Sequence, residues 1–125
     1  MSQYVDTNTK GFVAAGVIKL YARVILGSGG TITEAVLAER EIGIAMTPGL
    51  AIGDIVTVKL RSANGTHKVI AAAAITRGAS CFSAAAGRVS NTATGAFNVG
   101  IALEAAGALG DVIEMLYIPA NLAVA

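Results

Sequence analysis

The order of apolar and polar residues along the chain predicts short β-strands. Ile18, Leu20, Ala22 and Val24 alternate with Lys19, Tyr21 and Arg23. Successive side chains of a strand point to opposite faces, so this alternation predicts a half-buried strand over residues 18–24. Residues 55–60 show the same period, with Val56, Val58 and Leu60 on an apolar face and Ile55, Thr57 and Lys59 on a mixed one. Both stretches indicate a β-protein.

The pattern of residues 11–60 recurs without a gap in residues 68–117, 57 positions later. Ile42-Gly43-Ile44-Ala45-Met46 corresponds to Val99-Gly100-Ile101-Ala102-Leu103, and Gly53-Asp54 corresponds to Gly110-Asp111. Ala14-Ala15, Ile18, Ala22 and Gly30 correspond to Ala71-Ala72, Ile75, Ala79 and Gly87. Chance would rarely preserve the glycines, the Gly-Asp pair and the apolar pattern together, so we interpret the chain as a duplicated β-unit.

The repeat also settles segments that are ambiguous alone. Residues Thr31 to Glu41 contain several helix formers, but the equivalent residues Arg88 to Asn98 do not. The repeat therefore predicts strand plus loop for residues 31–41. Taken alone, residues 33–40 leave helix open. Further strands are expected at residues 42–46, with Gly43 allowing close backbone approach, and at 80–83, 97–103 and 112–118. Turns are expected at Gly27-Ser28-Gly29-Gly30, at Asn64-Gly65 and at Ala86-Gly87, and Pro119 ends the last strand.

The two ends of the chain have no counterpart in the repeat. Residues 1–10 are polar and predict a flexible arm, whereas residues 120–125 form a mostly apolar tail. The expected organisation is therefore a single all-β domain over residues 11–119, made of repeats 11–60 and 68–117, forming a compact barrel or sandwich. We expect the two ends to make intersubunit or other partner contacts, through Tyr4, Asp6, Lys10, Leu122 and Val124.

The composition narrows the possible partners. Only 14% of the residues are charged and 54% are hydrophobic, which favours a surface partly covered by other subunits. The net charge of +1 comes from scattered residues, so nucleic-acid binding is disfavoured. The first ten residues lack the apolar core of a signal peptide, and no stretch is long and apolar enough for a membrane helix. A single cysteine fits a reducing, cytoplasmic origin.

No catalytic, cofactor or metal constellation stands out. Asp54 and Asp111 are the acids at matching positions, and we expect their carboxylates to accept backbone N–H bonds in turns. His67 is expected at the surface, and Cys81 is expected to be a buried structural thiol. The glycine-rich turn at residues 27–30 lacks the Lys-Ser/Thr end of a phosphate loop. We predict no enzymatic activity and no cofactor.

Residues 65–119 resemble the family of phage capsid cement (head decoration) proteins. The resemblance rests on Gly78-Ala79 before a strand, the turn Gly87-Arg88-Val89, the run Gly100 to Ala106 and Gly110-Asp111 before the last strand. IGIAMTPGLAIGDIVTVKL in the first copy is similar to the upstream half of the same family. Two features depart from the family pattern: Cys81-Phe82 stands where an aliphatic residue and a tyrosine are expected, and the tail beyond Pro119 is extra.

The resemblance implies a non-enzymatic structural protein of a bacteriophage virion. Such a protein is made in the host cytoplasm, binds the major capsid protein on the capsid exterior and stabilises contacts between capsomers, usually as a small symmetric oligomer. We expect a homotrimer, and the sequence leaves a dimer open. The alternative is a β-barrel binding module outside any virion, because a duplicated unit with Gly-Asp turns also suits a ligand-binding barrel. An enzyme ranks third.

Overall fold

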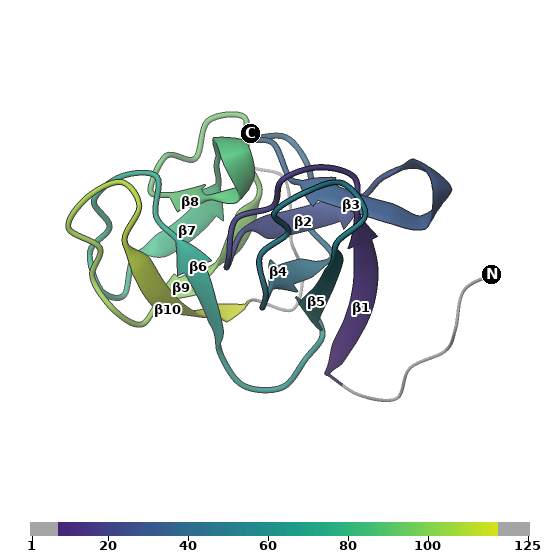
Figure 1. The fold of residues 1–125 in the computed structure, drawn as a ribbon. Helices are drawn as coiled ribbons and strands as arrows, with labels where there is room; N and C mark the ends of the chain where they lie inside the picture. The colour runs from purple at the N-terminus through teal and green to yellow at the C-terminus, as the bar shows by residue number, and fades with distance from the viewer. Residues whose placement is uncertain (1–7, 118–125) are drawn as a thin grey trace.

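Ten short strands make up two lobes that lie side by side in the computed structural model, which describes residues 8–117 (Figure 1). The first lobe contains β1 (Thr9–Ala14), β2 (Arg23–Leu26), β3 (Thr31–Glu34), β4 (Gly43–Ala45) and β5 (Ile55–Leu60). The second lobe contains β6 (His67–Ile70), β7 (Ser80–Ser83), β8 (Val89–Ser90), β9 (Asn98–Ala102) and β10 (Val112–Tyr117). A 3-10 turn precedes β3 and β8: η1 (Ser28–Gly30) and η2 (Ala85–Gly87). The expected all-β class is confirmed.

Each lobe is a barrel-like sheet, although only the first closes fully. The first lobe is a closed barrel with strand order β1-β3-β2-β4-β5, whose one parallel pairing joins β1 to β3. The second lobe is a five-stranded sheet of order β6-β10-β9-β7-β8. Its edges meet at a single parallel bridge, Ala71 to Val89, at the position where Ala14 pairs with Ile32 in the first lobe. The second sheet therefore curls towards the same closed shape.

Matching elements of the two lobes lie 57 residues apart. This spacing separates β2 from β7, η1 from η2 and β5 from β10. Loop hydrogen bonds repeat as well: the amide of Ala45 donates to the carbonyl of Ala22, and the amide of Ala102 donates to the carbonyl of Ala79. Gly43 is confirmed as a point of close approach, since an added Cβ would meet the carbonyl oxygen of Lys59. Turns lie at residues 27–30, 64–65 and 86–87 as expected, and residues 31–41 form strand plus loop.

The predicted strand over residues 18–24 is wrong in its extent. Ile18 makes an isolated bridge to Gly49, and the chain then turns before β2 begins at Arg23. Tyr21 has a positive φ of 67°, where the second lobe has Gly78 with a φ of 87°. The hydrogen bond from the amide of Tyr21 to the carbonyl of Ala45 holds this turn, so the alternation of residue types there does not report a continuous strand.

The boundary of the N-terminal arm needs correction too. Thr9 and Lys10, expected in the arm, are the first residues of β1 and pair with Lys59 and Val58 of β5. Polar side chains at these positions are compatible with a strand because they lie outside the barrel core. Residues 1–7 and 118–125, including Pro119, lie outside the described residues.

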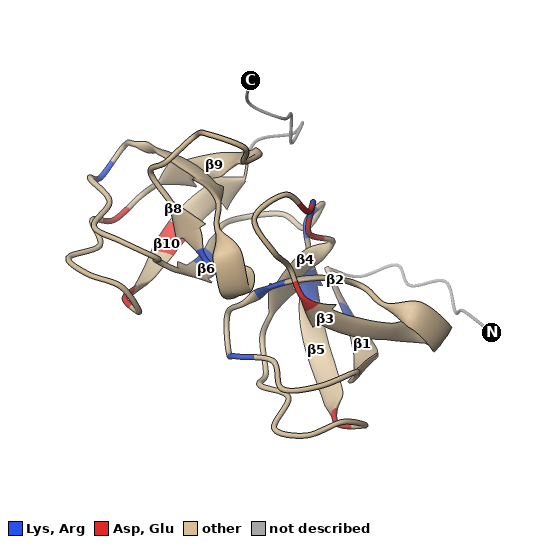
Figure 2. Cartoon of the chain, turned by 90° about the horizontal axis from the view of Figure 1, so that it is seen from above, with Lys and Arg blue, Asp and Glu red and all other residues tan. Residues whose placement is uncertain are grey.

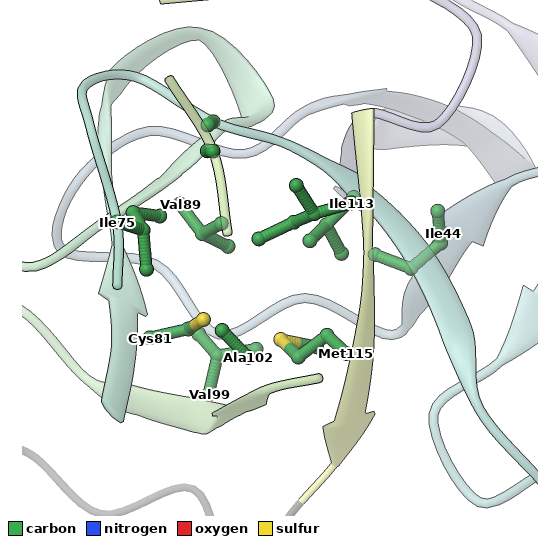
Figure 3. Packing of buried hydrophobic residues seen from close by; sticks show 11 residues of the cluster. Ile44, Ile75, Cys81, Val89, Val99, Ala102, Ile113 and Met115 are labelled. Carbon is green, nitrogen blue, oxygen red and sulfur yellow. The ribbon is translucent and has the colours of Figure 1, made fainter. Parts of the chain in front are cut away.

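The core consists of two clusters of buried side chains, and each contains one residue from the other lobe. Figure 3 shows the larger cluster, which fills the second lobe and includes Ile44 from β4 of the first lobe. The other cluster fills the barrel of the first lobe and includes Ile70 from β6 of the second. The contact between the lobes is therefore part of the hydrophobic core.

Candidate interaction surfaces

The contact between the lobes joins the outer face of β2 and β4 to β6 and η2. Ile44 is wholly buried and Ile70 retains 6% exposure. The amide of Gly87 donates to the carbonyl of Ala35 over 2.8 Å. A Cβ at Gly87 would lie 2.9 Å from the Cβ of Ala22, so only glycine allows the lobes to approach this closely. These contacts make a closely packed joint.

Arg23 is the polar anchor of this joint. Its side chain is wholly buried and forms an ion pair of 3.2 Å with Glu41, which is also wholly buried. The guanidinium also donates to the carbonyl oxygens of Ala84 and Arg88 in the second lobe, at 2.6 and 2.8 Å. Because a buried guanidinium needs acceptors for its several N–H groups, these carbonyls fix η2 against β2.

The expectation that His67 lies at the surface is wrong. His67 is 2% exposed, its Nε2 lies 3.0 Å from the carbonyl oxygen of Leu60, and its ring meets the ring of Tyr117 edge-on at 4.6 Å. Burial lowers the pKa of His67 below its ordinary value of 6.5, although the bond to Leu60 opposes that shift. Burial also raises the pKa of Tyr117 well above 10, and the carboxylate of Glu41 adds to that rise. These residues form a buried polar cluster at the junction of the lobes.

An apolar groove of about 800 Å³ lies on the first lobe. Large apolar side chains face it from β1, β2 and β5, and three of them are substantially exposed: Val13, Leu26 and Ile55. Gly29 and Gly30 of η1 form another part of its wall. Fully burying an aliphatic side chain of this size contributes about 1.5–3 kcal/mol of favourable free energy. A partner that covers the groove would therefore gain free energy by removing these side chains from water.

Of the five expected contact residues, the structure describes one. Lys10 lines the apolar groove, and its Nζ lies 5.6 Å from the centre of the Phe12 ring. Tyr4, Asp6, Leu122 and Val124 lie outside the described residues. The sequence did not predict the groove. Two identical pairs of the repeat, Ala22/Ala79 and Gly30/Gly87, could have indicated it, because Gly30 lines the groove and Gly87 meets Ala22 at the joint between the lobes.

The other candidate residues, Asp54, Asp111 and Cys81, stabilise turns or fill the core. The carboxylate of Asp54 accepts from the amides of Leu50 and Ala51, and that of Asp111 accepts from Gly107 and Ala108. Both aspartates therefore hold turns, as predicted. Cys81 is buried, which confirms the expectation of a structural thiol, and burial raises its pKa to about 11.

Charged side chains are sparse over the described chain, as the scattered blue and red segments of Figure 2 show. Within residues 8–117, no three His, Cys, Asp or Glu side chains gather in a way that could hold a metal ion. The same part of the chain has no helix of the length and apolarity needed to cross a membrane. The most distinctive surface of the described chain is thus apolar, not charged or chelating.

Comparison with known proteins gives one family. No curated protein matches the chain. The family model of the phage cement protein matches residues 5–117, which include both lobes and the joint between them. That family is one of structural, capsid-associated phage proteins and not of enzymes. The match covers nearly the whole chain, and the chain belongs to the phage cement protein family.

Proposed function

We propose that this protein binds the outer surface of an assembled phage capsid, where it stabilises contacts between capsomers. Its partners are the major capsid protein and further copies of itself, in a homotrimer. Family membership supports the association with a capsid. The apolar groove with Val13, Leu26 and Ile55 exposed supports the association with further subunits, because a cement works by burying area across subunit boundaries.

The function is a binding function, without catalysis. The ionisable groups described above have structural roles: those buried at the junction of the lobes stabilise the fold, and the turn aspartates stabilise loops. We further propose that residues 1–7 and the tail 120–125, with Tyr4, Asp6, Leu122 and Val124, contact the capsid or a neighbouring subunit. The protein is made in the host cytoplasm and joins the virion from there.

Binding to capsids that lack the protein tests the proposal. Capsids of its own phage, assembled without this gene product, are incubated with the purified protein and sedimented. We expect saturable co-sedimentation and a higher temperature of capsid disruption. Absence of saturable binding would overturn the capsid role, and binding without stabilisation would overturn the cementing role.

A further inference from the structure

The joint within the chain has two sides that can be defined by residues. The first lobe provides the docking face, formed by Ala22, Arg23 and Ile44. The second lobe provides the receiving face, formed by Ile70, Ala84 and Gly87. The two faces meet through the hydrogen bonds and the close glycine contact described above, and both are buried.

Because the chain is duplicated, each lobe contains the counterpart of both faces. The counterpart of the docking face lies on the second lobe, at Ala79, Ser80 and Ile101. The counterpart of the receiving face lies on the first lobe, at Val13, Gly27 and Gly30. The register is the same in both lobes, since Arg23 pairs with Ile44 and Ser80 pairs with Ile101.

These counterparts are uncovered. Ile101 is 38% exposed where Ile44 is wholly buried, and Val13 is 38% exposed where Ile70 retains 6%. Val13 and Gly30 also line the apolar groove. The groove is therefore the empty equivalent of the surface that the second lobe uses to receive the first.

The two small residues that meet most closely at the joint are the same in both lobes. Within the chain, the contact uses Ala22 of the first lobe and Gly87 of the second. Their counterparts are Ala79 and Gly30, and a Cβ at Gly30 would have no atom within 4 Å. The two residues that make the closest contact thus occur a second time, with open space where a partner would stand.

We propose that the uncovered docking face of one copy, on its second lobe, packs into the apolar groove on the first lobe of the next copy. This contact is heterologous, because two different faces meet, so successive copies close into a ring when the rotation permits. Three copies give a ring of six lobes, in which contacts within and between chains alternate. The inference rests on the self-association part of the proposed function and not on capsid binding.

A second copy suits this groove in its chemistry. Ser80 replaces Arg23 on the uncovered docking face, and Leu26 replaces Ser83 beside the uncovered receiving face. The contact between copies is therefore mainly apolar, with Lys10 at the groove as a charged neighbour, and it lacks the buried ion pair of the joint within the chain. It resembles a core surface cut in half, as in stable homo-oligomers.

Two blocking variants and their mixture test the contact. Val13→Lys places a charge in the groove, and Ile101→Lys places one on the uncovered docking face. Each variant retains one intact face, so we expect each alone to be monomeric by light scattering. An equimolar mixture should form a dimer of one copy of each and nothing larger, whereas the unaltered protein forms a trimer.

Leu109→Lys is the matched control, because Leu109 is 62% exposed and belongs to neither face. This variant should remain a trimer. Circular dichroism checks that each variant is folded. If a lysine variant does not fold, Val13→Thr or Ile101→Thr replaces it, because threonine keeps a high β-propensity. A mixture that stays monomeric, a blocking variant that remains trimeric, or an unaltered protein that is monomeric overturns the contact. Capsid co-sedimentation is measured separately, so failure of the capsid role is distinguishable.

Discussion

Arg23 of β2 and Glu41, in the loop before β4, form a wholly buried ion pair beside the turn η2 of the second lobe. Besides the 3.2 Å contact to Glu41, Arg23 donates to the carbonyls of Ala84 and Arg88. Its counterpart in the second lobe is Ser80, which is exposed. The two lobes therefore share a backbone pattern but differ at this position, so the joint within the chain has a polar anchor that the matching position of the second lobe lacks.

Replacing Arg23 should strongly destabilise the fold. Arg23→Met removes the guanidinium from beside a buried carboxylate and from two buried carbonyls, and losing one partner of a buried pair costs about 3–5 kcal/mol. Denaturant unfolding measures this loss. Lys19→Met is the matched control, since Lys19 pairs with Glu34 at 2.8 Å but is partly exposed, and exposed pairs contribute about 0–1 kcal/mol. Equal losses for both variants would contradict an anchoring role.

The Arg23 anchor also shows where sequence reasoning stops. Alternation assigned Arg23 to a polar face, because a lone charged residue between apolar ones usually meets water. In the fold a second lobe covers that face, and two of the acceptors of Arg23, the carbonyls of Ala84 and Arg88, lie more than 60 positions away in the sequence. His67 was expected at the surface because it ends the loop between the repeats, next to Lys68. Such burial depends on long-range contacts, which the local pattern does not report.

Features governed by local chemistry were predicted well. The strand at residues 80–83 begins and ends as expected. In the Gly-Asp turns, backbone amides donate to the aspartate carboxylates, also as expected. The repeat carried the interpretation of residues 31–41, whose own composition also allowed helix. The groove was not predicted, because it forms where β1, β2, β5 and η1 of the first lobe come together and is not a property of any one segment.

Stability should fall on acidification through the range just below pH 6.5, because of His67. Burial lowers its pKa in the folded state, so in this range the unfolded chain binds more protons than the folded one and stability decreases as pH falls. The decrease levels off below the folded-state pKa. His67→Phe, which keeps a ring beside Tyr117, should remove this slope, as unfolding at several pH values would show. His67 is the single histidine of the chain, so an unchanged slope in the variant would exclude it as the cause.

Cys81 should react with thiol reagents only when the second lobe opens. Burial raises its pKa to about 11, so little thiolate exists at neutral pH and the sulfur is shielded. We expect negligible labelling of the native protein by an aromatic disulfide reagent and complete labelling in denaturant. Leu109→Cys, at a position 62% exposed and outside both faces of the proposed contact, provides the control and should add one thiol that reacts immediately. Rapid native labelling of the unaltered protein would contradict the packing around Cys81.

The ends of the chain should be dispensable for folding. Deleting residues 1–7 and 118–125 leaves both lobes and the hydrogen bond from Leu60 to the carbonyl of Asn8, so the melting temperature should change little. Capsid binding or oligomerisation should weaken. As a control, a deletion that extends through Lys10 also removes the pairs of Thr9 and Lys10 with β5 and should lower the melting temperature clearly. If the shorter deletion already unfolds the protein, the ends belong to the core.

Alanine at Gly87 and at Gly30 should separate folding from assembly. Both glycines have positive φ, 72° and 79°, so each alanine adds similar backbone strain of about 1–2 kcal/mol. At Gly87 the new methyl also meets Ala22 at 2.9 Å, and such overpacking adds roughly 1–3 kcal/mol of destabilisation. At Gly30 it meets nothing within the chain, but in the proposed ring it would strike Ala79 of the next copy.

Gly87→Ala should therefore lower the free energy of unfolding more than Gly30→Ala does, as denaturant titration at low protein concentration would show. Gly30→Ala should instead convert trimer to monomer in light scattering, and a Gly30→Ala protein that remains trimeric would place the contact elsewhere.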